Sequence, residues 1–444
     1  MSKKSDHEQF YWKHWQSGKL PELEDHSEKK LDLLRDYLVL YLEIVMKGTT
    51  GKDEQFVTLI DGFAGGGIYN GNKFGSPITI LKAVEEAEAR INLGRDKKTR
   101  ITPICYFIEE DPNAYACLEA ALKTHGYEER IGKTIHLHRN QFVNVIPAII
   151  ADINQRHKRG GNRTIFFLDQ CGWTEISAAT IRDVSIQLHQ RPEFIVNFAI
   201  SWLTDFISDK TQDAKIKSLQ KLGLEGFVDI PAMMKLRSEL GGHWEHAVEA
   251  HIGEGFHKAT GISYFSPFYI EPESNHRGYW LLHLAGSARA RSAMTEIHWS
   301  KANRSKHYGY NGYDMLSYKP NLEPTQFIQG MSFDDECRKQ CEAALAADFG
   351  RLLRDQHAGG ITFKQFLDNT SNKIMATAPM VEEVVWQLSQ SKEFEIRCPS
   401  GSPKRSANFA DDDIIMPRQQ FFLPGVEVST GRSPKAKGLN GSSK

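Results

Sequence analysis

The sequence predicts an α/β protein with a doubly wound, mostly parallel sheet. Two observations support this fold class. Apolar, strand-like segments alternate with amphipathic, helix-like segments over residues 27–303, and a cluster of glycines directly follows the first of these strands. Strands that alternate with helices over short connections form parallel sheets covered on both faces, and ligands bind at the carboxyl ends of the strands.

The predicted elements follow one another in a regular order. A helix is expected from the N-cap residue Ser27 to the stop residue Gly48. Five apolar runs after it are predicted strands, and a helical segment follows each of the first three. The strand segments are "QFVTLID" (55–61), "RITPICYFIEED" (100–111), "KTIHLHRNQF" (133–142), "NRTIFFLDQCGW" (162–173) and "RPEFIVNFAISWLTDF" (191–206), of which the last leads into a loop. Two later segments, "GISYFSPFYIEP" (261–272) and "RGYWLLHLAG" (277–286), are predicted to form a closing strand pair.

Composition limits the class of protein. The chain has 444 residues, of which 40% are hydrophobic and 25% charged, which is typical of a soluble globular protein with more than one domain. Its formal net charge of -1 means that any nucleic-acid surface must be local. Six cysteines without CxxC pairs favour reduced thiols, and no apolar run is long enough to cross a bilayer. We therefore expect a cytoplasmic protein without a membrane partner.

The chain is expected to divide into two domains. An N-terminal extension (1–26) precedes the α/β domain (27–303), which contains a helical insertion at about 205–260. A linker (304–325), a winged-helix-like domain (326–425) and a disordered tail (426–444) follow. The winged-helix prediction rests on the order helix, helix, strand, basic loop, strand.

The basic loop of the second domain contains Lys404 and Arg405, which we predict to contact phosphate. Glu382 and Glu383 stand early in the preceding helix, where they would repel phosphate. Protein contact and plain packing therefore stay open as alternatives for this domain.

The glycine cluster "LIDGFAGGGIYNG" (59–71) predicts a binding loop, because glycine permits positive φ and close approach of the backbone to a ligand. It lacks the G-x-G-x-x-G spacing of dinucleotide-binding folds. Its D-x-F-A-G-x-G pattern instead resembles the first motif of class I S-adenosylmethionine-dependent methyltransferases; a tight structural turn is the alternative. The matching residues are Asp61, Phe63, Ala64, Gly65 and Gly67. Glu109, directly after the second strand, is predicted to accept hydrogen bonds from ribose hydroxyls.

Longer segments resemble one particular family. "LIDGFAGGGIYNGNKFGSPI", "FIEEDPNAYACLE", "TIFFLDQCGW" and "YWLLHLAGSARARSAMTEIHW" together look like the three-Cys-motif partner proteins, over roughly residues 25 to 425. This is a bacterial and phage family with a methyltransferase-like domain, named for a neighbouring radical-SAM-like protein that carries the cysteines. The resemblance implies S-adenosylmethionine as cofactor and that radical-SAM-like protein as partner. It also implies cofactor contacts by Ser76 and Pro77, and Asn140 as a residue near the adenine.

The loop after the fourth strand is where the substrate is expected. Amino-methyltransferases carry [DNS]-P-P-[YF] at this place, whereas this chain has Asp169-Gln170-Cys171-Gly172-Trp173. We expect Asp169 to orient a substrate amine or hydroxyl and Trp173 to replace the missing stacking ring. Cys171 is either a thiolate nucleophile, as in pyrimidine-C5 methyltransferases, or a small buried residue beside a glycine turn.

Three hypotheses for function follow from these residues. The first is a methyltransferase that acts on nucleic acid, either DNA or RNA. The second is a non-catalytic recognition subunit that binds S-adenosylmethionine or a nucleotide. The third is another nucleic-acid-processing enzyme, acting in phage defence or repair. A metal is not expected, because His136 and His138 lack a third ligand nearby.

Overall fold

The computed structural model describes residues 12–47, 54–157, 163–170, 175–189, 191–198, 212–240, 244–270, 279–301, 312–313 and 333–418. Within these ranges, no helix combines the length and the apolar composition that crossing a bilayer requires.

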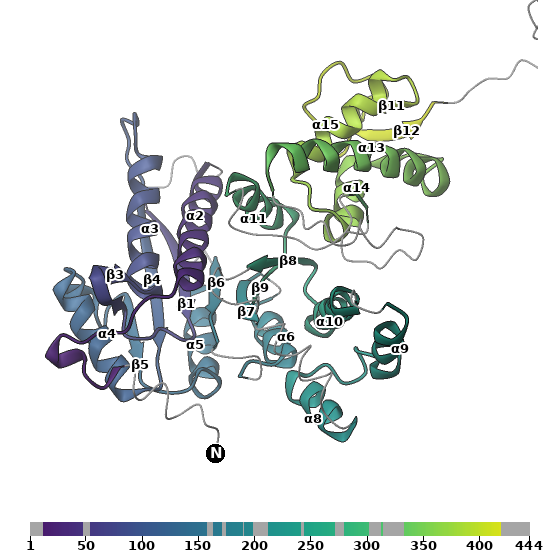
Figure 1. Cartoon of the computed structure of the whole chain (residues 1–444). Coiled ribbons are helices and arrows are strands. Elements are labelled where there is room, and N and C mark those ends of the chain that lie inside the picture. Colours follow the sequence, from purple (N-terminus) through teal and green to yellow (C-terminus); the bar gives the residue numbers. More distant parts are fainter. Residues whose placement is uncertain are drawn as a thin grey trace, which may run out of the picture.

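A seven-stranded sheet forms the centre of the first domain, in the order β5-β4-β1-β6-β7-β9-β8 (Figure 1). The first five strands of this order are parallel, and β9 is antiparallel to both of its neighbours. The prediction of an α/β fold with a mostly parallel sheet is confirmed. The strands are β1 (Glu54–Asp61), β4 (Arg100–Ile108), β5 (Ile135–His138), β6 (Thr164–Leu168), β7 (Glu193–Phe198), β8 (Tyr264–Ile270) and β9 (Tyr279–Ala285).

Helices cover both faces of this sheet because its strands are apolar on both sides. In β1, Leu59 belongs to the core with α2, α3, α4 and α11, whereas its neighbour Ile60 belongs to the core with α5 and α6. In β4, Phe107 belongs to the same core as Leu59, and Tyr106 belongs to the same core as Ile60. The helices are α2 (Asp25–Lys47), α3 (Ser76–Ile91), α4 (Pro112–Thr124), α5 (Phe142–His157), α6 (Ala178–Gln187) and α11 (Ala288–Ser300).

Two insertions interrupt the alternation. A short hairpin of β2 (Ile68–Tyr69) and β3 (Lys73–Phe74) separates β1 from α3. Between β7 and β8 the chain forms α8 (Gln212–Leu222), α9 (Ile230–Leu240) and α10 (Trp244–Thr260). Both insertions leave the sheet at the carboxyl end of a parallel strand, the edge where ligands bind in such sheets.

The C-terminal domain has its own apolar core and a three-stranded antiparallel sheet in the order β10-β12-β11. Its elements are α13 (Asp335–Gln356), β10 (Ile361–Thr362), α14 (Phe363–Thr370), α15 (Ala378–Gln390), β11 (Phe394–Arg397) and β12 (Ile414–Pro417).

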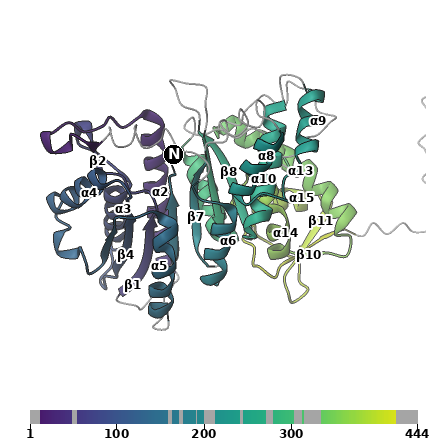
Figure 2. The same cartoon turned by 90° about the horizontal axis from the view of Figure 1, so that it is seen from below.

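This second domain packs beside α11 and the edge strand β8 (Figures 1 and 2). Arg291 of α11 is 2% exposed and donates to the carbonyl oxygens of Ile374 and Ala376. Asn372 accepts a hydrogen bond from the Phe265 amide of β8 and donates to a neighbouring carbonyl. A buried guanidinium that donates to two carbonyl groups of the other domain ties the stability of the two domains together.

Candidate cofactor and substrate site

The glycine loop leaves β1 at the centre of the sheet. Gly65 and Gly67 have φ values of +59° and +74°, a backbone conformation that favours glycine. The loop is closed by a hydrogen bond from the Gly75 amide to the Gly67 oxygen, and α3 begins at the next residue, Ser76, followed by Pro77. The predicted loop therefore ends at a helix N-terminus, a favourable place for an anionic group.

Trp12 covers this loop from the N-terminal segment. A Cβ atom placed on Gly66 would lie 2.2 Å from Cζ3 of Trp12, so only glycine fits there. The indole is 7% exposed and packs with Ala114 and Cys117 of α4, and its ring stands edge-on to Tyr69. The N-terminal segment thus fixes the position of the loop, a role that sequence reasoning missed.

Asp61 is the last residue of β1 and is fully buried. Its Oδ1 atom accepts a hydrogen bond from the Phe63 amide at 3.1 Å. Burial raises the pKa of Asp61 to about 7, although the nearby Ser76 hydroxyl and the Phe63 N–H oppose this. The negative charges of Asp169 and Glu109 raise it further, which shows that the three predicted site carboxylates lie near one another.

Glu109 follows β4 and lies against the glycine loop. Its Oε2 atom accepts a hydrogen bond from the Gly65 amide at 2.7 Å, and its Oε1 atom accepts one from the Asp111 amide at 2.8 Å. Asp111 caps α4 through the amides of Asn113 and Ala114. A carboxylate oxygen can accept a second hydrogen bond, so Glu109 retains acceptor capacity towards a ligand.

Asp169 lies directly after β6 and is held by two side chains. The Lys30 ammonium donates to both of its oxygens, at 2.8 and 3.0 Å, and the Asn197 amide donates to Oδ1 at 2.6 Å. Lys30 is 5% exposed, while Asp169 is 25% exposed. Asn197 interrupts an apolar strand segment of the sequence, and the structure places it near the end of β7 in contact with a predicted site residue.

The loop that follows is organised by Gln170. Its Oε1 atom accepts hydrogen bonds from the amides of Glu175 and Ile176, so both ends of the loop meet at one side chain. Cys171 and Trp173 lie outside the described residues, and the alternatives for Cys171 stay open.

Some of the buried side-chain atoms that lack a hydrogen-bond partner in the described part of the chain lie at the carboxyl edge of the sheet. Four buried atoms there have no hydrogen-bond partner among the described residues: Asp61 Oδ2, His138 Nε2, Gln170 Nε2 and Asn197 Oδ1. Asp61 and His138 are the last residues of β1 and β5, Gln170 comes two residues after β6, and Asn197 is the last residue but one of β7. These four strands are parallel to one another. Because buried polar groups are nearly always hydrogen-bonded in native proteins, this edge is suited to a polar ligand.

Other predicted residues have local partners. Asn140 accepts hydrogen bonds from the Gln141 amide and from Asn144, close to the start of α5. Lys404 forms an ion pair with Asp413, which is 1% exposed, and lies over the Phe409 ring. Arg405 is exposed. The described residues contain no group of three or more potential metal ligands.

Neither a protein-family model nor a curated protein sequence matches the chain. Among solved structures, a Legionella pneumophila protein of family DUF519 has a TM-score of 0.30 at 11% identity, covering 57% of this chain and 84% of its own. A possible exported protein from Bordetella parapertussis has a TM-score of 0.23 at 10% identity, covering 56% of this chain and 66% of its own. The plantazolicin methyltransferase BamL, solved with SAH and a triazolic desmethylPZN analog, has a TM-score of 0.23 at 8% identity, covering 64% of this chain and 91% of its own. Scores of this size carry no conclusion about the function of this chain.

Two residues that contact Asp169 could have been noticed in the sequence. Lys30 stands one helical turn before Leu34, on the stripe of the first helix that is otherwise apolar. Asn197 interrupts an apolar strand. A polar residue at a buried position requires a partner, but the identity of that partner is set by the fold.

Proposed function

We propose that the protein binds S-adenosylmethionine at the carboxyl edge of its sheet and transfers the methyl group to a substrate. The observation that carries this proposal is the hydrogen bond between Glu109 and the amide of Gly65. It brings an acid after the second strand in contact with the glycine loop after the first, beside four buried polar atoms that lack described partners.

The residues of this edge fit such a cofactor. Glu109 has acceptor capacity for the two ribose hydroxyls. The amides at the start of α3 would face the carboxylate of the methionine part, and Asp61 would accept from its ammonium group. The cofactor supplies a methyl group on a sulfonium, which a nucleophile of the substrate displaces.

Asp169 is the group we assign to the substrate. Lys30 and Asn197 fix its carboxylate in one orientation, and its 25% exposure leaves it accessible from the site. In this position it would accept a hydrogen bond from the attacking amine or hydroxyl and favour loss of its proton. Lys30 then acts as a positioning residue, because it contacts Asp169 and not the reacting atoms.

Calorimetry with S-adenosylmethionine and S-adenosylhomocysteine tests cofactor binding. Glu109→Ala should weaken binding by roughly 1 to 3 kcal/mol, the range for loss of a hydrogen bond to a charged group. Glu110→Ala is the matched control, since the neighbouring acid has no described contact with the loop. If neither ligand binds at millimolar concentration, the proposed function is wrong.

We further propose that the substrate is nucleic acid and that the C-terminal domain is winged-helix-like. The order helix, strand, helix, helix, strand, strand around a three-stranded sheet supports the second statement. The exposed Arg405 is the better candidate for phosphate contact, because Lys404 is engaged by buried Asp413. Arg405→Ala should lower the salt dependence of nucleic-acid binding by about one phosphate, whereas Lys404→Ala should mainly destabilise the domain.

A non-catalytic binding role is the second candidate. It is favoured by the loop after β6, which lacks the proline and tyrosine of amino-methyltransferases, and by the three hydrogen bonds that Asp169 already accepts from Lys30 and Asn197. Mass spectrometry of DNA and RNA from cells with the wild type or with Asp169→Asn distinguishes the two. A methylated base present only with the wild type supports transfer, and its absence from both samples supports binding alone.

The proposed association with a radical-SAM-like three-cysteine protein rests on the sequence resemblance. Co-purification of the two proteins expressed together, with and without residues 326–444, tests it and shows whether the C-terminal domain takes part.

A further inference from the structure

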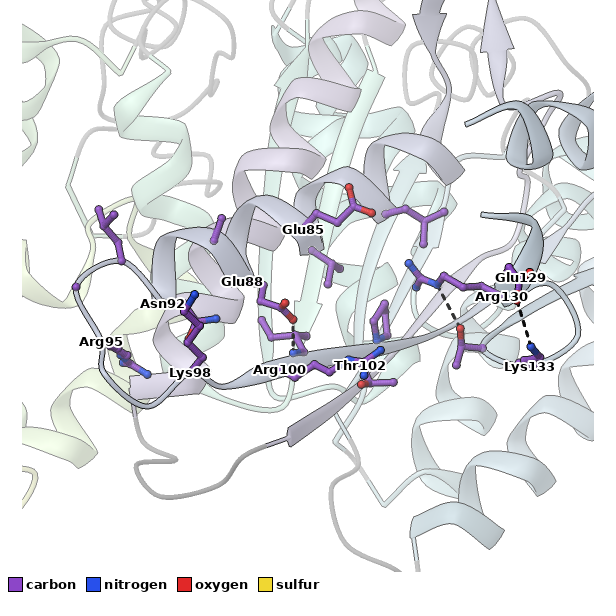
Figure 3. Close-up of a pocket in the computed structure, with 18 residues that line it drawn as sticks. Glu85, Glu88, Asn92, Arg95, Lys98, Arg100, Thr102, Glu129, Arg130 and Lys133 are labelled. Carbon is purple, nitrogen blue, oxygen red and sulfur yellow. Dashed lines mark hydrogen bonds and ion pairs between the residues drawn. The ribbon is translucent and has the colours of Figure 1, made fainter. Parts of the chain in front are cut away.

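A cavity lies at the opposite end of the sheet from the candidate cofactor site. It has a volume of about 900 Å³ and is bounded by the last turns of α3, the loop 92–99, the start of β4 and the segment 129–134 before β5 (Figure 3). These are the amino ends of parallel strands, so a ligand here would not compete for the glycine loop.

The loop that forms one wall is held in a fixed shape. The Asn92 side chain donates to the Thr99 oxygen at 2.8 Å, and its own oxygen accepts from the Thr99 amide at 2.8 Å. Gly94, between them, has a φ of +71°. Because reciprocal hydrogen bonds already fix the backbone of this loop, binding of a ligand costs little backbone conformational entropy there.

The three carboxylates that line the cavity have partners within the protein. Glu88 accepts from the Ile101 amide at 2.5 Å, and Glu85 forms a hydrogen bond with the Tyr127 hydroxyl. Glu129 faces Lys133 at 3.9 Å. Their charges are therefore partly compensated before any ligand arrives.

The positive charges that line the cavity have fewer partners within the protein than its carboxylates have. Arg95, Lys98 and Arg100 line it and have no ion pair or side-chain hydrogen bond within the described chain. Figure 3 shows them one after another along the loop and into β4, with Arg130 and Lys133 on the other side of Thr102. Two guanidinium groups and an ammonium within six residues favour a phosphate over a single carboxylate.

The floor of the cavity is apolar. Leu81, Val84 and Ile101 contribute to it and are each less than 5% exposed as residues. A volume of this size is that of a small-molecule site, and apolar side chains beside a few charged groups are the usual lining of one. We propose that this cavity binds a phosphate-bearing small molecule of nucleotide size, with its phosphates at Arg95, Lys98 and Arg100 and its planar part over the apolar floor.

Calorimetry with ATP, AMP, adenosine, inorganic phosphate and a single-stranded oligonucleotide tests the proposal on the full-length protein. S-adenosylhomocysteine is present in excess to fill the candidate cofactor site. We expect ATP and AMP to bind and adenosine not to bind. The double variant Arg95→Ala/Lys98→Ala should weaken ATP binding at least tenfold. Arg289→Ala/Lys339→Ala removes the same two charges from exposed positions outside the cavity and should leave the affinity unchanged.

Three results would overturn the assignment. The first is that no phosphate probe binds at millimolar concentration. The second is equal loss of affinity in both double variants, which would indicate a general effect of charge. The third is binding of a single-stranded oligonucleotide without binding of any mononucleotide, which would make the cavity part of a polymer surface. If S-adenosylhomocysteine itself fails to bind, the same titrations are run without it, so the two proposals fail independently.

Discussion

Replacing Asp61 by Asn should stabilise the fold at neutral pH while weakening cofactor binding. The carboxyl of Asp61 is fully buried, and its pKa is raised from 3.8 to about 7, mainly by burial. The unfolded chain therefore ionises this group about three pH units below the folded protein, which corresponds to roughly 4 kcal/mol at 1.36 kcal/mol per pH unit. Asn keeps the acceptor for the Phe63 amide and removes the charge.

The sign of the pH dependence follows from proton binding. Below pH 3.8 the carboxyl is protonated in both states, so Asp61 contributes no difference in stability. Between that pH and about 7 the folded state holds the proton and the unfolded state does not, so the free energy of unfolding falls as pH rises. Above about pH 7 the carboxyl is ionised in both states, and the free energy of unfolding no longer changes through this group.

Urea denaturation of the wild type and of Asp61→Asn at pH 4.5, 6, 7 and 8.5 measures this difference. The variant should become progressively more stable than the wild type up to about pH 7, by as much as ~4 kcal/mol, and the difference should then stay constant. Calorimetry should show the variant binding S-adenosylmethionine more weakly. A difference in stability that does not change with pH would refute the assigned pKa and the reasoning built on it.

Three further substitutions test the glycine loop, the partner of Asp169 and the domain interface. Gly66→Ala should destabilise the loop by about 1 to 3 kcal/mol because its Cβ would overlap the Trp12 ring, and Trp12→Leu in the same chain should recover part of this in thermal denaturation. Lys30→Met should abolish methyl transfer and leave cofactor affinity within about twofold, with Lys29→Met as control; a large loss of affinity would place Lys30 at the cofactor instead. Arg291→Met should lower the free energy of unfolding by about 2 to 5 kcal/mol, since two carbonyl groups of the C-terminal domain lose their donor, and unchanged stability would show that the domains are not coupled.

The strands and their order along the chain could be predicted because each carries a local signal. The strand predicted at residues 55–61 differs by one residue from β1 (Glu54–Asp61), and the predicted first helix begins two residues from the start of α2 (Asp25–Lys47). The position of Glu109 could also be predicted, because an acid directly after an apolar parallel strand lies at the carboxyl edge of the sheet.

Lys30 and Trp12 could not be assigned in the same way. The contact between Lys30 and Asp169 spans 139 residues of sequence, and nothing in either segment specifies the other. The overlap of Trp12 with Gly66 depends on how the N-terminal segment crosses the loop. Such contacts are set by tertiary packing, which hydrophobic periodicity does not encode.

Among the described residues, some buried polar atoms without hydrogen-bond partners lie at the carboxyl edge of the sheet, where a core built only for stability would have apolar side chains. Asp61 has one oxygen without a partner in the described structure, and Asn197 donates to Asp169 while its own oxygen lacks one. A sequence selected for stability alone would favour apolar side chains of similar volume at both places, because each unsatisfied buried group costs about 1 to 3 kcal/mol. Both lie at the carboxyl ends of parallel strands. A local loss of stability at the edge where the fold places ligands is expected if binding there restores the missing hydrogen bonds.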